Sequence, residues 1–322
     1  MMNSRTIYLR ADFWKELRKD TSIEGKMLLM EVYEAISAST LHSDIEDELW
    51  SSDEYLKIIM KKWEGGRMQI ELYETLPVDR PTYNAVSLSA IYLAEENNMT
   101  CDGIGAKYGV VVLNSGTLKR RQLCKGDSIM LNKGEVYHER YYTFKDKLTH
   151  PCNAMLVIDP YLLSRRENIE NNVASLLDVM LPTNRQEYEF HISFFSTLGM
   201  QSEWQMQTIY DELQRLIIRL RKCLTYSLTL YSIGKGEAFH SRMIITNNAI
   251  ISAEDGFEVF NGNGKSNKNA KFDIVFPRLA NDSRQDMSNY LRWIKIAKEY
   301  SEECSTKIFF GSRTNRLYSI VD

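Results

Sequence analysis

The chain has 322 residues, of which 43% are hydrophobic and 26% are charged, with a formal net charge of −3 at pH 7. This size predicts two domains or one large one with ordinary packed cores, and no apolar run approaches the roughly 18 residues of a membrane span. The charge balance excludes a protein that is basic overall, so a nucleic-acid role needs a local cationic patch.

The charged opening segment and the cysteine pattern favour a cytoplasmic protein. The opening "MMNSRTIYLRADFWKEL" interrupts its apolar residues with charges, so we expect no signal peptide. Cysteines stand at 101, 124, 152, 223 and 304 without a CxxC pair, which argues against a disulfide framework and against a zinc site.

Residues 1–149 are expected to form an α+β module of unknown role. The first 60 residues have helical spacing, as in "EGKMLLMEVYEAIS", and residues 84–97 are also expected to form a buried helix. "KYGVVVLN", "DSIMLN" and "VYHERYYTF" are typical of short strands. "GIGAKYG" at 103–109 is expected to be a turn, because a dinucleotide-binding glycine loop follows a strand and opens a helix.

From residue 150 onward, strand and helix patterns alternate. The apolar strand "NAMLVIDP" precedes a helix with the apolar residues Ile169, Val173 and Leu177 on one face. Further strands and helices follow, including "YEFHISFF", "EWQMQTIYDELQRLIIRL" and "YSLTLYS". The pattern predicts an α/β domain over 150–322, with a mostly parallel sheet covered by helices on both faces.

The stretch "EAFHSRMIITNNAIISAEDGFEVF", residues 237–260, carries the most specific motif. It gives His240-Ser241-Arg242, a short strand, Asn247-Asn248-Ala249, a second strand, and then "EDGFEVF". Together with "IDPYLLSRREN" at 158–168, this order resembles the phospholipase-D-like domain found C-terminal to MIT domains, and its bacterial relatives. The family's own motif is His-Asp-Arg, strand, Asp-Asn-Gly, strand, Gly-Arg-Gly-Leu-Asp-Phe. The resemblance covers residues 153–262.

The resemblance implies a phosphodiesterase-type site shared by two chains. In the wider superfamily two histidines meet, often across a dimer; one attacks phosphorus and the other protonates the leaving oxygen. Carried over, His240 is the candidate nucleophile, Arg242 the phosphate clamp, and Asn247 stands where the family has Asp. Asn247 supplies no carboxylate, so the implied chemistry is slow or the site only binds. One motif per chain implies a homodimer.

A flexible loop, "NGNGKSNKNAK" at 261–271, adds candidate phosphate contacts at Lys265, Lys268 and Lys271. The histidines show no His-x3-His spacing and no accompanying carboxylate cluster, so we expect neither a metal nor a cofactor.

Three functions remain open on the sequence. The first is binding of nucleic acid or another phosphate ligand, as an effector or accessory of a bacterial anti-phage or mobile-element conflict system with its own protein partners. The second is an active metal-independent nuclease or phosphodiesterase that uses His240. The third is a protein-interaction scaffold.

Overall fold

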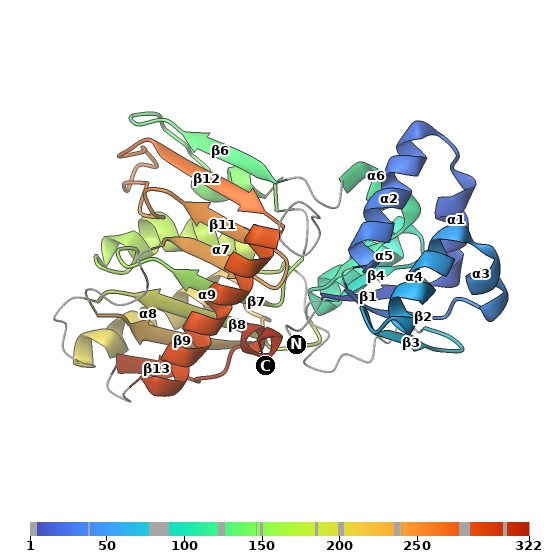
Figure 1. The fold of residues 1–322 in the computed structure, drawn as a ribbon. Coiled ribbons are helices and arrows are strands. Elements are labelled where there is room, and N and C mark those ends of the chain that lie inside the picture. Colours follow the sequence, from blue (N-terminus) through green and yellow to red (C-terminus); the bar gives the residue numbers. More distant parts are fainter. Residues whose placement is uncertain are drawn as a thin grey trace.

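A computed structural model describes residues 5–37, 39–76, 90–121, 126–145, 147–148, 151–183, 186–198, 203–234, 239, 241–276, 284–304 and 308–321. Over these residues the chain forms two units, each built on one β-sheet (Figure 1). None of the helices in these ranges is long and apolar enough to cross a membrane. We call the unit that ends with residue 121 the N-terminal module, and the rest the C-terminal domain.

In the described part of the N-terminal module, the sheet has five strands, all parallel, in the order β3-β2-β1-β4-β5. The chain steps outward from β1 to β3 and then returns to the other side of β1 as β4. This is a doubly wound topology, whose direction reverses between β1 and β4. The strands are β1 (Arg5–Leu9), β2 (Ser39–Ser43), β3 (Ile70–Leu72), β4 (Ile91–Leu93) and β5 (Val111–Leu113).

Helices cover both faces of this sheet. On one face, Ile7 and Leu41 pack in a common core with Leu28 and Val32 of α2; on the other, Tyr92 and Val112 pack with residues of α5. The helices are α1 (Ala11–Lys19), α2 (Ile23–Ser37), α3 (Asp47–Ser52), α4 (Glu54–Glu64), α5 (Asn98–Tyr108) and α6 (Ser115–Arg121).

The expected α+β class of this module is corrected to α/β, because its described strands are all parallel. The short strands β4 and β5 are buried on both sides, so their sequences show no alternation that separates strand from buried helix. The expected helix over 84–97 contains β4, and its residues 84–89 lie outside the described ranges. Residues 103–108 of the expected turn instead form the second half of α5, and Gly109 is the C-cap of this helix.

The sheet of the C-terminal domain is mixed, with the order β13-β9-β8-β7-β10-β11-β12-β6 over the described residues. Strands β7, β8 and β9 run parallel, whereas β10, β11, β12, β6 and β13 pair antiparallel with their neighbours. The strands are β6 (Asp127–Leu131), β7 (Ala154–Ile158), β8 (Phe190–Ser196), β9 (Tyr226–Ser232), β10 (Met243–Thr246), β11 (Ile250–Ala253), β12 (Ala270–Val275) and β13 (Phe309–Gly311).

Helices lie on both faces of this sheet, as predicted. Leu177 of α7 and Leu213 of α8 pack with the core on one face, while Tyr290 and Ile294 of α9 pack with Leu156 on the other. Figure 1 shows α9 crossing the sheet diagonally. The helices are η2 (Arg140–Phe144), the π-helical turn η3 (Ile169–Val173), α7 (Ala174–Met180), α8 (Glu203–Leu220), α9 (Arg284–Glu303) and η5 (Arg316–Ile320).

Three expectations for this domain need correction. The sheet is mixed and not mostly parallel, because a hairpin-like run of antiparallel strands follows β9. Strand β6 pairs with β12, so the C-terminal domain begins before residue 127 and not at 150. "VYHERYYTF" contains the 3₁₀ helix η2 and not a strand, because Tyr141 and Phe144, three residues apart, both pack inward against Phe272.

Candidate functional site

The site predicted around Arg242 lies where the strand order of the C-terminal sheet reverses. Strands β7, β8 and β9 lie side by side in that order. The next strand, β10, pairs with the other edge of β7. Arg242 immediately precedes β10, and Asp159 immediately follows its neighbour β7. In open α/β sheets the crevice outside the carboxyl ends of the strands, at such a reversal, is where ligands bind.

Asp159 organises this edge, although the sequence reasoning did not assign it to the site. Its side chain is buried, and its two oxygens accept the backbone N–H groups of Tyr161 at 2.8 Å, Leu162 at 3.2 Å and Phe257 at 2.7 Å. Burial raises the pKa of Asp159, while the N–H groups and the Arg242 charge act in the opposite direction. The feature of the sequence that could have identified Asp159 is its position directly after a buried apolar strand.

Arg242 is half-buried and is held by two contacts. Its Nη1 donates to the Glu254 carbonyl at 2.7 Å, and its guanidinium carbon lies over the Tyr161 ring, 5.4 Å from the centroid. Its Nε is buried and has no hydrogen-bond partner in the described part of the chain. A planar fork fixed in this way keeps donors for an anion.

Gly256 lets the 254–257 loop approach both of these side chains. Its φ is +84°, a conformation that residues with a side chain rarely adopt. A Cβ at this position would meet Cδ of Arg242 at 2.8 Å and Oδ2 of Asp159 at 2.9 Å. The glycine of "DGF" in the motif is therefore required by the backbone conformation of this loop.

The three loop lysines are placed differently. Lys268 Nζ donates to the Asp255 carbonyl, which directly follows the carbonyl that Arg242 holds, so the structure brings these two cations to one loop. Lys271 is exposed and pairs with Asp273 at 2.8 Å. Lys265 is exposed and its backbone bridges to Val136. Among the three, Lys268 contacts the loop beside Arg242 through its side chain, whereas Lys271 contacts it through its backbone carbonyl, which accepts the Glu254 N–H at 3.3 Å.

His240 lies outside the described residues, so its role as nucleophile stays a prediction. Its neighbour Phe239 is buried, with its ring stacked 5.1 Å from that of Phe195 at the end of β8.

Asn247 lies at the opposite end of β10 from Arg242. Its side chain is fully buried: Oδ1 accepts the Asn153 N–H at 3.0 Å, and Nδ2 donates to the Gly109 carbonyl at 3.0 Å. Because Gly109 belongs to the N-terminal module, Asn247 joins the two units. The structure therefore does not bring Asn247 together with Arg242.

Asn247 is part of a cap on helix α5. The carbonyls of Ala106, Lys107, Tyr108 and Gly109 accept, respectively, from Gln186 Nε2 (3.4 Å), the Glu187 N–H (3.0 Å), Asn153 Nδ2 (3.1 Å) and Asn247 Nδ2 (3.0 Å). The last carbonyls of a helix have no partner within the helix. Here the C-terminal domain supplies the partners, so the two units share a polar interface.

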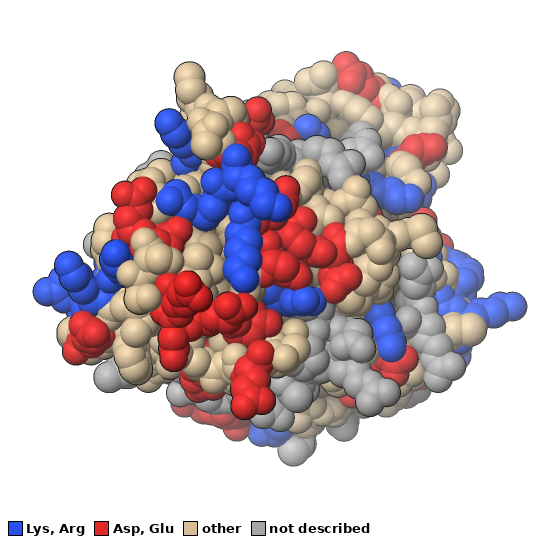
Figure 2. Space-filling model, turned by 90° about the vertical axis from the view of Figure 1, so that its right-hand side faces the viewer, with Lys and Arg blue, Asp and Glu red and all other residues tan. Residues whose placement is uncertain are grey.

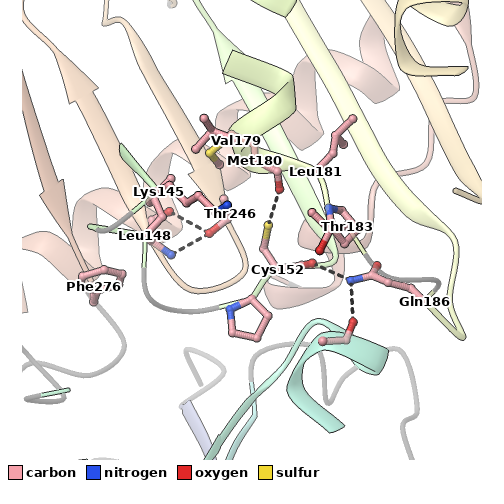
Figure 3. A pocket seen from close by; sticks show the side chains of 14 residues that line it. Lys145, Leu148, Cys152, Val179, Met180, Leu181, Thr183, Gln186, Thr246 and Phe276 are labelled. Carbon is pink, nitrogen blue, oxygen red and sulfur yellow. Dashed lines mark hydrogen bonds between the residues drawn. The ribbon is translucent and has the colours of Figure 1, made fainter. Parts of the chain in front are cut away.

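A pocket of about 230 Å³ lies beside this interface (Figure 3). It is lined by residues of both units, with Ala106 from α5, and its walls include Leu148, Val179 and Met180. Cys152 points its Sγ toward the Met180 carbonyl, 3.7 Å away, and burial raises the pKa of this thiol to about 12. The thiol is therefore protonated at neutral pH and offers no nucleophile.

In the N-terminal module, charged side chains also gather at the carboxyl ends of the parallel strands. The sequence did not predict this second cluster. Arg10, directly after β1, pairs with Asp12 at 2.8 Å and with Glu96 at 3.0 Å, across the point where the strand order reverses. Asp12 also accepts the Phe13 N–H at 2.7 Å. Over the described ranges, no three His, Cys, Asp or Glu side chains lie close enough together to hold a metal ion.

The outer face of the N-terminal module mixes charges of both signs (Figure 2). On α1, for example, Lys15 pairs with Glu46 at 3.3 Å and Arg18 with Asp53 at 2.8 Å. Such a surface forms no single-sign field that would attract a polyanion.

Comparison of the chain with protein-family models and with curated proteins gives no match. The likeness to phospholipase-D-like domains thus rests on the motif order alone.

Proposed function

We propose that this protein binds a phosphate-bearing ligand, with nucleic acid as the first candidate, at the edge formed by Asp159, Arg242 and the 254–257 loop. The observation that carries the proposal is the state of Arg242: a half-buried guanidinium, oriented by the Glu254 carbonyl and the Tyr161 ring. An arginine held in this way loses little side-chain entropy when it binds an anion.

The surroundings of Arg242 support the same function. The Asp159 carboxylate accepts three backbone N–H groups, and the charge of Arg242 acts to lower its pKa although the two side chains form no direct ion pair in the described structure. Lys268 adds a second positive charge on the same loop.

The wider role follows from the resemblance and forms part of the proposal. It is that of an effector or accessory in a bacterial anti-phage or mobile-element conflict system, acting as a homodimer in the cytoplasm. With Asn247 in place of the family's Asp, and engaged at the other end of β10, the site is proposed to bind and not to turn over its ligand.

Arg242 variants test this function. Arg242→Ala should weaken binding of a labelled single-stranded oligonucleotide about tenfold or more in fluorescence anisotropy, because a charge-assisted bond is lost. Arg242→Lys should lose less, since the charge remains but the fork does not. The slope of log affinity against log salt should shrink in Arg242→Ala.

Lys271→Ala is the matched control, because Lys271 already pairs with Asp273. Lys268→Ala should fall between the control and Arg242→Ala. Equal, salt-independent affinity in wild type and both Arg242 variants would remove Arg242 from the site and leave the scaffold function. Cleavage of the oligonucleotide that survives EDTA and is lost in His240→Ala would instead establish the nuclease.

A further inference from the structure

A tyrosine ring stands exposed beside the proposed phosphate clamp. Tyr161 is 50% exposed, although it lies only two residues after the buried Asp159. Its N–H bonds to Asp159 at 2.8 Å, and its carbonyl accepts from the Ser164 N–H at 3.0 Å and the Ser164 hydroxyl at 2.6 Å. The backbone that carries the ring is thus fixed on both sides.

The ring and the guanidinium form one assembly. The guanidinium carbon of Arg242 lies over the ring at 5.4 Å from its centroid, which is within the range of a cation–π contact. The half of Tyr161 that stays exposed leaves aromatic surface for a second planar group. A nucleobase fits such a surface, because every base has a flat π-face and stacks on aromatic side chains.

This pairing of groups selects among phosphate ligands. Arg242 can hold the phosphate of any of them, but Tyr161 adds affinity only for a ligand with an unstacked aromatic ring near the phosphate. In duplexes the bases are already stacked and paired, whereas in single strands they are free to stack on protein. We propose that Tyr161 is a base-stacking platform and that the ligand is single-stranded nucleic acid; this rests on the proposed function of Arg242.

The test compares two probes of equal length and charge, a single-stranded oligonucleotide and its abasic counterpart, by fluorescence anisotropy. Tyr161→Ala should weaken binding of the oligonucleotide about fivefold more than it weakens binding of the abasic probe, because loss on the abasic probe reports only the positioning of Arg242. Tyr161→Phe keeps the ring and should bind both probes like wild type.

Tyr142→Ala is a matched control, because Tyr142 is 41% exposed and its ring lies 4.7 Å from Lys145 Nζ and not under Arg242. It should bind like wild type. An equal loss on both probes in Tyr161→Ala would mean that the ring only positions Arg242. Unchanged binding of both probes would mean that the ring does not contact the ligand. Either result overturns the stacking proposal. If Arg242→Ala also leaves the abasic probe unaffected, the proposed function itself fails.

Discussion

At the scale of single residues, Asn247 has the contacts of a side chain that holds the fold together. Both ends of its amide are used: Oδ1 accepts from the backbone of Asn153, and Nδ2 donates to Gly109 in the other unit. A carboxylate at this position could keep the first bond but not the second. It would also place a negative charge against the Gly109 carbonyl in a buried site.

Asn247→Asp should therefore lower the free energy of unfolding by about 2–3 kcal/mol, because a buried donor is replaced by an unpaired charge. Urea denaturation at neutral pH measures the change. The exposed Asn263→Asp is the control and should stay within about 0.5 kcal/mol of wild type. We also expect no gain of phosphodiesterase activity in Asn247→Asp; a stable variant with new activity would restore Asn247 to the catalytic site.

The sequence pointed to Arg242 but not to its partners. The His-x-Arg spacing was visible because it is local, whereas Asp159 and Tyr161 reach Arg242 only through the pairing of β7 with β10. Strand pairing over such a separation is not encoded in any short window. Asn247 was placed beside Arg242 by the spacing of the motif, and four intervening strand residues carry it to the other end of β10.

At the scale of elements, an aromatic ladder crosses the parallel sheet of the N-terminal module. His42, Tyr8 and Tyr92 are in register on β2, β1 and β4, and the ring centroids lie 4.6 Å and 4.4 Å apart. His42 Nδ1 lies 2.9 Å from the Tyr73 hydroxyl. Burial lowers the pKa of His42 below its ordinary value of 6.5, while the charge of Glu71 acts in the opposite direction.

The lowered pKa of His42 predicts a pH dependence. The unfolded chain takes up the proton first, so the stability due to neutral His42 is present above pH 6.5 and is lost as the pH falls through the folded pKa. His42→Phe keeps a ring in the ladder and should lose less stability than wild type between pH 7 and pH 5, as measured by urea midpoints.

His191 has a pKa lowered in the same direction, chiefly by burial, so part of the pH dependence should remain in His42→Phe. The exposed His138→Gln is the control and should follow the wild-type curve. A wild-type midpoint that does not fall between pH 7 and pH 5 would contradict the predicted direction for both half-buried histidines.

Most of the long periodic elements were predicted from the sequence. The helices α2, α8 and α9 and the strands β7, β8 and β9 lie where the periodicity placed them. The elements missed include the short strand β4 and the 11-residue helix α5. Gly109, at φ +66°, marks the end of α5 by the usual glycine signal, but the glycines at 103 and 105 within the same helix made the segment resemble a turn.

At the scale of the whole molecule, one motif per chain predicts a homodimer. Light scattering at micromolar concentration should give twice the chain mass of 37.5 kDa. In a Cys223→Ser background, spin labels at Ser241→Cys should lie close together across the dimer, because the resemblance requires the two motifs to share a cleft. Labels at Ser51→Cys, exposed on α3, serve as the distant control.

A monomer at every concentration tested would remove the shared cleft. A dimer with the Ser241→Cys labels farther apart than the Ser51→Cys labels would do the same. The division into two units was predicted from the sequence, but the boundary was not, because β6 joins the C-terminal sheet through partners more than a hundred residues away.

The cap on α5 also sets an order of events during synthesis. The carbonyls from Ala106 to Gly109 leave the ribosome well before Asn153, Gln186, Glu187 and Asn247, which bind them. Water must therefore donate hydrogen bonds to these carbonyls until those residues emerge. The end of α5 in a nascent N-terminal module is therefore capped in stages, and the carbonyl of its C-cap residue, Gly109, gains its partner only when Asn247 is translated, more than a hundred codons later.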